Sequence, residues 1–313
     1  MNSKICIIVV WFGNLPAWLP YFLQTCAKCE GFDWQIFTDT RTPEVVPHNV
    51  KFIPLSKHEF EVIVSRCMES EFRYSHGYKL CDLKPAYGHF FEKWLHQYDY
   101  WGYGDLDVIM GNPISFLRQA KALDADVITA NAKILVGHFT LLRNTSHLRL
   151  LYRDCPEWKD KFNDTNYIVF DEKDFSDLVK SQSSKGLLSL AIVPLVQEDC
   201  LIKWAGRPSF FIFWNNGRLF DLLILKEFGY FHFIQTKYKT AILKPVDHVI
   251  GSSFILTQTG FHSLNSTNDY LRNLIRFFYE VIRTVPWYLR QLLKRFLPSS
   301  IRRFLTCFLK KSS

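Results

Sequence analysis

The first half of the chain alternates between short apolar runs and longer amphipathic stretches. Residues 4–11, 33–37 and 50–54 are rich in β-branched and aromatic side chains and end in polar or turn-forming residues, which is typical of buried strands. The stretches between them, such as residues 18–29 and 57–74, have the composition of helices. Strands that alternate with helices predict an α/β fold with a mostly parallel sheet covered by helices.

The same rhythm continues to about residue 130. We predict a helix over residues 84–96, a strand near residues 98–101 and another strand at residues 127–130. Ligands bind beyond the carboxyl ends of the strands in sheets of this kind. Two polar segments fall at such ends, namely Thr38-Asp39 and Asp105-Leu106-Asp107.

The pattern is less regular over residues 131–262. Breaker-rich stretches near residues 163–165 and 180–186 predict loops. Two apolar runs flank Asn215-Asn-Gly-Arg218, and an Asn-Gly pair between such runs predicts a β-hairpin.

The segment from residue 264 onward differs in character from the rest. Apolar residues recur there at helical spacing while arginines lie along one flank, which predicts an amphipathic helix. Pro286 suits the first turn of a second helix over residues 287–297. The predicted division is therefore a main domain of residues 1–263 and a basic helical tail of residues 264–313. The apolar positions that define the first helix are Leu271, Leu274, Ile275, Phe278, Ile282 and Val285.

The positive charge of the chain lies in this tail. Of the 38 basic and 30 acidic side chains, ten and two lie in residues 264–313, so the tail has a net charge of +8 and the main domain sums to zero. A neutral main domain gives no support to nucleic-acid binding. Basic flanks beside apolar faces instead predict peripheral attachment to an anionic membrane, with packing of the tail on the domain as the alternative.

The cysteines and the apolar runs bear on location. Eight cysteines are scattered without zinc-site spacing, which predicts reduced thiols in a cytosolic protein. The apolar run at the N-terminus is too short for a signal peptide and fits a buried strand. No segment offers the roughly 20 uninterrupted apolar residues of a membrane span.

Asp105-Leu-Asp107 is the strongest chemical signal. Two carboxylates two residues apart on an extended segment project to the same side, where their oxygens suit Mg²⁺ or Mn²⁺. Such an ion bridges a diphosphate and neutralises charge on a leaving group. A solvated turn or a helix cap is the structural alternative for this pair.

Further candidates accompany this pair. Asp82 and Lys84 lie near the predicted start of a helix, where Asp82 suits a cap and a lysine is unfavourable unless it contacts an anion. His232 is a candidate metal ligand or, as the alternative, a buried core residue, and Lys237 is a candidate phosphate contact. Asp171-Glu172 forms a second acidic pair, which suits either a contact with a bound substrate or the start of a helix.

The segments Cys81-Asp-Leu-Lys-Pro-Ala-Tyr87 and Tyr98-Asp-Tyr-Trp-Gly-Tyr-Gly-Asp-Leu-Asp107 resemble a bacterial family of GT-A glycosyltransferase-like proteins from polysaccharide gene clusters. The chain is similar in pattern to glycosyltransferases with the DXD sugar-binding motif. The resemblance extends over roughly residues 4–245 and implies a GT-A, Rossmann-like fold.

The resemblance also implies roles for the candidate residues. Asp105 and Asp107 are expected to hold Mn²⁺ or Mg²⁺ and the donor diphosphate, with His232 as the later metal ligand and Lys237 on the phosphates. Asp171 and Glu172 are expected near the reacting sugar or the acceptor. The remaining residues are expected to contact the donor: Phe12, Thr38 and Asp39 at the nucleotide, and Asp82 and Lys84 at the sugar or its phosphate.

The resulting hypothesis is sugar transfer from a nucleoside diphosphate sugar, UDP-linked, to a saccharide or lipid-linked saccharide in surface polysaccharide synthesis. The expected location is the cytoplasmic face of the plasma membrane, with no nucleic acid as partner. The alternatives are a non-catalytic sugar-binding or scaffold protein on a degenerate GT-A fold, a nucleic-acid-binding protein and a nucleotidyltransferase. A nucleotidyltransferase has less support, because no Gly-rich phosphate loop follows the first strand of this sequence.

Overall fold

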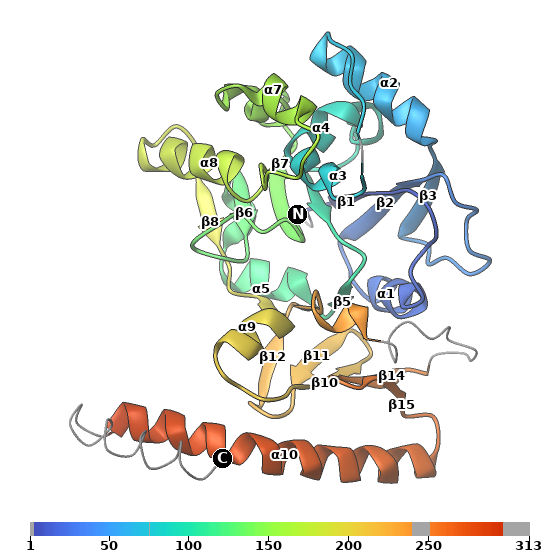
Figure 1. Cartoon of the computed structure of the whole chain (residues 1–313), viewed down its shortest axis with the longest axis vertical. Helices are drawn as coiled ribbons and strands as arrows, with labels where there is room; N and C mark the ends of the chain where they lie inside the picture. Colours follow the sequence, from blue (N-terminus) through green and yellow to red (C-terminus); the bar gives the residue numbers. More distant parts are fainter. Residues whose placement is uncertain (1–2, 75, 240–250, 297–313) are drawn as a thin grey trace.

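A central seven-stranded sheet organises the molecule (Figure 1). The computed structural model describes residues 3–74, 76–239 and 251–296, without the side chains of 290 and 292–296. In spatial order the strands are β3 (Val50–Pro54), β2 (Phe32–Thr38), β1 (Ile5–Trp11), β4 (Tyr100–Gly104), β7 (Phe139–Arg143), β6 (Val127–Thr129) and β8 (Leu190–Ile192). Only β7 runs against its neighbours, so the sheet is mostly parallel, as predicted.

Helices cover both faces of this sheet (Figure 1). One face packs against α2 (Lys57–Met68), α4 (Tyr87–Phe90), α6 (Ser146–Leu150), α7 (Trp158–Asn163) and α8 (Asp174–Ser184), and the other packs against α1 (Leu19–Cys26) and α5 (Pro113–Gln119). Strand β1 serves both cores, because Cys6 and Ile8 face one and Ile7 and Val9 face the other. The predicted α/β class is confirmed.

The helix predicted over residues 84–96 is broken into short turns. They are α3 (Lys79–Asp82), η1 (Lys84–Ala86), α4 and η2 (Glu92–Trp94). Close packing explains the departure: a Cβ on Gly88 would lie 2.3 Å from the ring of Trp101, and Phe91 stacks on Phe37 at 3.8 Å. Tertiary contacts therefore override the helical pattern here. Short 3₁₀ turns occur elsewhere at η3 (Ala122–Asp124) and η4 (Leu151–Asp154).

Two smaller sheets follow in the second half. One is antiparallel, with the strands β12 (Lys226–Phe228), β11 (Arg218–Asp221), β10 (Phe211–Asn215), β14 (Ser253–Thr257) and β15 (Gly260–Ser263). The predicted hairpin joins β10 to β11, and its turn residues Asn216 and Gly217 both have positive φ, as a type I′ turn requires. The predicted loop at residues 180–186 begins later, because α8 extends to Ser184.

The third sheet positions the candidate chemistry. It consists of β5 (Val108–Met110), β13 (Tyr230–His232) and β9 (Val196–Glu198). His232 is in register with Val108 on one side and with Glu198 on the other. Asp107 directly precedes β5, so this register brings residues that lie 125 positions apart in sequence to one edge.

The C-terminal segment forms a single helix, α10 (Thr267–Phe296), so the prediction of two helices divided at Pro286 is wrong. The helix packs on the five-stranded sheet through residues that include Phe277 and Val281 (Figure 1). Contacts just after the proline hold the helix in line, since the Trp287 indole donates to the Ala205 carbonyl and the Tyr288 hydroxyl donates to the Leu223 carbonyl. The division of the chain at residue 263 stays a prediction.

His262, on β15, links the stability of this region to pH. Its Nε2 lies 2.9 Å from Thr257 Oγ1, and burial together with the Arg276 charge lowers its pKa from 6.5 to about 4. Above pH 6.5 the imidazole is neutral in both the folded and the unfolded chain. Below that, only the unfolded chain takes up the proton, so stability is lost as pH falls toward 4, with a slope of up to about 1.4 kcal/mol per pH unit.

We therefore expect urea unfolding of His262→Gln to depend less on pH than that of the wild type between pH 6.5 and 4. The difference in unfolding free energy between the two proteins is the relevant readout, because other groups titrate in both. Equal slopes would contradict the assignment of this acid sensitivity to His262.

Candidate functional site

A cavity of about 550 Å³ opens beside the ends of β1 and β4. Eight residues singled out from the sequence line it: Phe12, Lys84, Asp105, Asp107, Asp171, Glu172, His232 and Lys237. Thr38, Asp39 and Asp82 are not among its lining residues. The cavity collects side chains from segments spread over more than 220 positions of sequence, which a local pattern does not predict.

Asp105, Asp107 and His232 converge in this cavity. Each offers one ligand atom, and these atoms all lie within 4.8 Å of one another. Asp105 follows β4, Asp107 precedes β5, and His232 ends β13. Two carboxylate oxygens and one imidazole nitrogen form a donor set that fits a divalent cation of the manganese or magnesium type.

The charge of Asp107 is balanced by two cationic side chains. Its Oδ2 accepts from Lys237 Nζ at 2.8 Å and lies 3.5 Å from His232 Nε2. Burial alone would raise the pKa of Asp107, but His232 and Lys237 hold it well below its usual range. Burial would likewise lower the pKa of His232, but Asp107 and Glu198 outweigh it and raise that pKa to about 10.

Lys84 is the counterion of Asp105. Its Nζ donates to Asp105 Oδ1 at 2.6 Å and to the Gly137 carbonyl at 2.9 Å. Burial opposes the charge on this lysine, but the carboxylates of Asp105 and Asp171 keep its pKa well above the ordinary value. Lys84 lies in η1 rather than at the start of a long helix. The anion that we predicted near Lys84 is therefore the carboxylate of Asp105.

Asp171 and Glu172 lie just before α8, on the side of the cavity formed by Gly137. Glu172 Oε1 accepts the Gly137 backbone N–H at 2.9 Å. Asp171 is fully buried, and its Oδ1 accepts no hydrogen bond from the described residues. Burial raises the pKa of Asp171 well above its ordinary value. This unpartnered buried carboxyl group is suited to a hydrogen bond with a polar ligand in the cavity.

Gly137 allows these acidic side chains to approach the backbone. A Cβ at this position would lie 2.6 Å from Asp171 Oδ2 and 3.2 Å from Glu172 Oε1. We expect Gly137→Ala to displace both acids and to reduce any turnover at this site about 100-fold, a loss that a misplacement of about 1 Å can cause.

Gly77→Ala is the matched control, because Gly77 also lines the cavity and a Cβ there meets nothing within 4 Å. The rate of any turnover at this site should fall only in Gly137→Ala, with thermal melting used to confirm that both variants are folded. Equal rates for the two variants would show that the contact of Gly137 with the acids is unimportant.

The residues predicted to contact the nucleotide, Phe12, Thr38 and Asp39, lie at the carboxyl ends of β1 and β2. Asp39 Oδ1 accepts the Gly13 N–H at 2.8 Å, which fixes the turn that follows β1. Phe12 in that turn lines the cavity and stacks on Tyr74 at 6.1 Å. Thr38 is buried at the end of β2. Asp39 therefore acts on the position of Phe12, and direct contact of Thr38 or Asp39 with a nucleotide stays a prediction.

The expectation that Asp82 touches the donor is corrected by the structure. Its carboxylate is completely buried and is bonded to Lys79 Nζ at 2.9 Å. It also accepts the backbone N–H groups of Ile168 at 3.1 Å and Phe170 at 2.8 Å. Asp82 closes α3 and does not cap a helix start. It therefore supports the loop that carries Asp171 and does not face the cavity.

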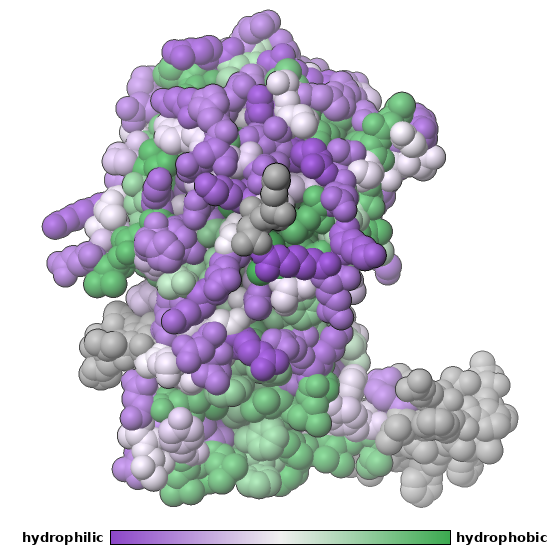
Figure 2. Space-filling model, turned by 180° about the vertical axis from the view of Figure 1, so that it is seen from behind, coloured by the Kyte–Doolittle hydropathy of each residue, from purple (hydrophilic) through white to green (hydrophobic). Residues whose placement is uncertain are grey.

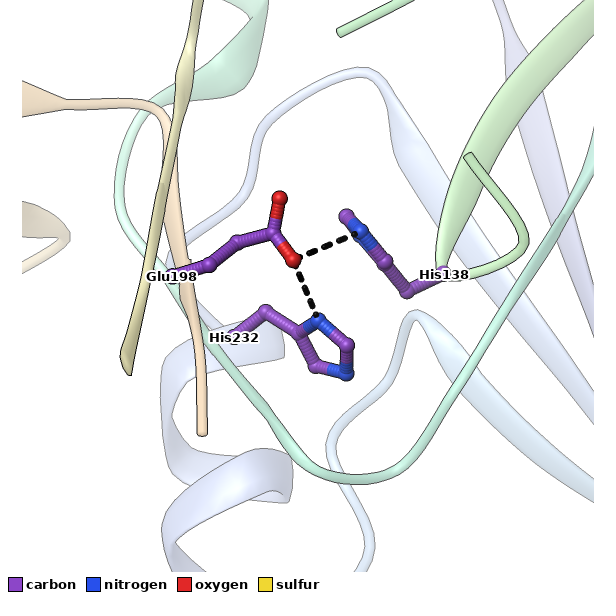
Figure 3. A group of neighbouring side chains, drawn as sticks. All are labelled: His138, Glu198 and His232. Carbon is purple, nitrogen blue, oxygen red and sulfur yellow. Dashed lines mark hydrogen bonds and ion pairs between the residues drawn. The ribbon is translucent and has the colours of Figure 1, made fainter. Parts of the chain in front are cut away.

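The sequence reasoning missed His138 and Glu198, which lie behind His232 (Figure 3). Glu198 Oε2 lies 3.2 Å from His232 Nδ1 and 3.5 Å from His138 Nε2. The two imidazole rings are 4.0 Å apart, and His138 Nδ1 is 2.9 Å from the Tyr230 hydroxyl. These three residues also satisfy the spacing of a metal-binding group. The acidic pair Glu198-Asp199 after an apolar stretch was the signal in the sequence that could have revealed Glu198.

The sequence matches a family model over residues 7–265. The chain belongs to this family, which is described as a family of unknown function (DUF6625). No curated protein matches the DUF6625 chain.

Among solved structures, the chain is similar to a galactosyltransferase, LgtC, determined in complex with donor and acceptor sugar analogues. The identity is 9%, the TM-score is 0.38, and the alignment covers 75% of this chain and 88% of that chain. A likeness this distant carries no argument about activity, so the function of this DUF6625 protein rests on its own residues.

Proposed function

We propose that this DUF6625 protein transfers a sugar from a nucleoside diphosphate sugar, UDP-linked, to a hydroxyl of a saccharide or lipid-linked saccharide. One observation carries the proposal: Asp105, Asp107 and His232 place their ligand atoms within 4.8 Å of one another at a cavity of about 550 Å³. A cation in such a donor set suits a diphosphate leaving group. The sequence resemblance to the GT-A enzymes supports the same reaction class.

The side chains around this group have matching roles in the proposal. Asp105, Asp107 and His232 would hold Mn²⁺ or Mg²⁺, which when bound would supply positive charge to a departing diphosphate. Lys237, which pairs with Asp107 at 2.8 Å, would contact a phosphate of the donor. Lys84 holds Asp105 in place, and Asp171 and Glu172 bind hydroxyls of the reacting sugar.

Retention of configuration is favoured only by the sequence resemblance to the GT-A glycosyltransferases. The alternative function, a non-catalytic sugar-binding protein on the same fold, predicts binding of a nucleotide sugar without turnover. The buried, unpartnered Asp171 Oδ1 in the cavity fits either a catalytic or a purely binding role.

The test is a thermal-shift screen of the full chain with nucleotide sugars in the presence and absence of Mn²⁺, followed by turnover of any sugar nucleotide that stabilises it. Ligand concentrations 100-fold above Kd stabilise a protein by about 2.7 kcal/mol, which gives a clear shift. Metal-dependent stabilisation with consumption of the donor is expected. Stabilisation without consumption, in the presence of saccharide acceptors, would favour the non-catalytic alternative.

We further propose that α10 attaches the protein to the cytoplasmic face of an anionic membrane. The helix packs on the sheet through one face and exposes a second apolar face. Figure 2 shows hydrophobic side chains gathered at the lower end of the molecule, the end at which Figure 1 places α10. The exposed apolar residues of α10 include Leu271, Leu274, Ile275, Phe278, Ile282 and Val285.

The basic residues of α10 support an anionic membrane as the binding partner of this apolar face. Arg272, Arg276 and Arg283 fall on one edge of α10 beside the exposed apolar face, and each basic residue near an anionic surface contributes about 1 kcal/mol. Among the described residues these apolar side chains of α10 are exposed, and an exposed apolar face is suited to docking. Among the described residues, no helix is long and apolar enough to cross a membrane.

We expect the wild type to float with phosphatidylglycerol vesicles and not with phosphatidylcholine vesicles. The double variant Leu274→Glu/Phe278→Glu should lose this binding by more than about 10-fold, because each large apolar side chain contributes about 1.5–3 kcal/mol on burial. Val62→Glu, on the exposed side of α2, is the control. Equal flotation of the double variant and the control would remove the membrane claim.

A further inference from the structure

Two acidic side chains lie where β9 meets the helix that follows it. Glu198 ends β9, and Asp199 begins α9 (Asp199–Trp204). Both are buried, with 8% and 5% exposure. The proposed function gives a role to neither residue. Glu198 contacts His232 and Asp199 contacts the segment that carries Lys237, and His232 and Lys237 are the cationic partners of Asp107.

Glu198 contacts His232 on the Nδ1 side of the imidazole ring (Figure 3). A carboxylate only accepts hydrogen bonds, so His232 Nδ1 at 3.2 Å must be the donor. His232 is neutral when it ligates a cation, and a neutral imidazole that donates through Nδ1 has its lone pair on Nε2. That Nε2 faces Asp107 Oδ2 at 3.5 Å and belongs to the same group as Asp105. Glu198 therefore selects the tautomer and the ring orientation in which His232 ligates a cation.

His138 and Tyr230 extend this arrangement. His138 Nε2 lies 3.5 Å from the same Glu198 oxygen, and its Nδ1 lies 2.9 Å from the Tyr230 hydroxyl. The ring of His138 lies 4.0 Å from that of His232, which limits rotation of His232. Glu198 is thus held between two imidazoles and cannot turn away from His232 without losing both contacts.

Asp199 acts on the turn that carries Lys237. Its two carboxylate oxygens accept the backbone N–H of Gln235 at 3.1 Å, and Oδ2 accepts the N–H of Thr236 at 2.6 Å. These bonds cap the start of η5 (Thr236–Tyr238), in which Lys237 reaches Asp107. The position of the Lys237 ammonium group is therefore set through the backbone by Asp199.

We infer that Glu198 and Asp199 are positioning residues for the cation and diphosphate site: Glu198 orients His232 through Nδ1, and Asp199 fixes the turn that presents Lys237. The inference rests on the proposed function, because it assumes that Asp105, Asp107 and His232 bind a cation. Carboxylates that accept from a ligating histidine typically contribute 10- to 100-fold to metal affinity. The structure thus adds two residues that no sequence pattern had assigned.

Manganese binding to the full chain, measured by electron paramagnetic resonance without nucleotide, tests the role of Glu198. Glu198→Ala should weaken Mn²⁺ binding about 10- to 100-fold. Glu198→Gln should recover most of it, because the amide oxygen still accepts from Nδ1. Glu227→Gln is the control, since Glu227 pairs with Arg218 on the surface. A merely structural role for Glu198 would lower the melting temperature of both variants and leave Mn²⁺ affinity unchanged.

Titration with UDP in the presence of saturating Mn²⁺ tests the role of Asp199. Asp199→Ala should keep Mn²⁺ affinity within about twofold and weaken UDP binding about 10-fold, because it removes every side-chain acceptor for the backbone N–H groups of Gln235 and Thr236. Unchanged UDP affinity in the folded variant would overturn the assignment of Asp199.

The outcomes distinguish a failure of the proposed function from a failure of the positioning role of Glu198. If the wild type binds no Mn²⁺, the proposed function fails. If the wild type binds Mn²⁺ and Glu198→Ala binds it equally well, the positioning role of Glu198 is overturned while the proposed function stands. If His138→Ala abolishes binding and Asp107→Asn does not, the cation lies among His138, Glu198 and His232, and Glu198 is a ligand instead.

Discussion

Asp107→Asn should reduce metal-dependent consumption of the donor on the order of 1,000-fold, the largest effect on activity that we expect. Asp107 is the one carboxylate of the group that faces both His232 and Lys237. An amide presents one neutral oxygen to a cation in place of a charged carboxylate, so both cation affinity and charge balance suffer. The rate with saturating donor and Mn²⁺ is the measurement.

The variant also changes the electrostatics of the free protein. Asp107 raises the pKa values of His232 and Lys237, so its loss leaves two buried basic groups with less compensation. Thermal melting must therefore confirm that the variant is folded at the assay temperature. Asp177→Asn, on the exposed face of α8, is the control for the substitution itself. Wild-type turnover and wild-type metal dependence in folded Asp107→Asn would contradict the proposed role of this residue.

Asp82→Ala should cost about 3 kcal/mol of unfolding free energy, the largest effect on stability that we expect. The substitution leaves the Lys79 ammonium buried at 1% exposure without its carboxylate partner. It also releases the N–H groups of Ile168 and Phe170, which flank Val169 at a φ of 63°. A β-branched residue in this conformation is strained, and Asp82 supplies the bonds that hold it there.

Urea unfolding of Asp82→Ala beside Asp177→Ala measures this cost, because the Asp177 side chain is 75% exposed and should contribute little. The loop released by Asp82→Ala leads directly to Asp171, so we expect turnover to fall as well. A fully stable Asp82→Ala with weakened donor binding would instead support the original prediction that Asp82 touches the donor.

The fold followed from the sequence where the signal was local. Alternating apolar runs predicted β1, β2 and β3, and Asn216-Gly217 predicted the turn of the hairpin, because both patterns depend on adjacent residues. The broken turns of residues 79–94 did not follow, since they depend on the approach of Trp101 to Gly88 across the sheet. The continuity of α10 through Pro286 depends likewise on contacts to Ala205 and Leu223.

The candidate site divides in the same way. Asp105 and Asp107 stood out because two acids follow an apolar strand, and the family resemblance pointed to His232 and Lys237, which the structure places beside Asp107. Their binding role stays a prediction. The donor contact expected of Asp82 came from the family resemblance alone, and the structure instead buries this carboxylate away from the residues that line the cavity.

Glu198 and His138 were missed for a different reason. Glu198 lies near His232 because β13 pairs with β9, and His138 lies near it directly before β7; both are long-range contacts. Gly137 was likewise invisible, because its importance lies in the 2.6 Å between its absent Cβ and Asp171.

The central claim is that Asp105, Asp107 and His232 hold a divalent cation, and anomalous diffraction from crystals grown with Mn²⁺ and UDP tests it most directly. The account predicts one manganese peak within coordination distance of both carboxylates and of His232 Nε2. A peak among His138, Glu198 and His232 Nδ1, or no peak in the cavity with UDP bound, would contradict it.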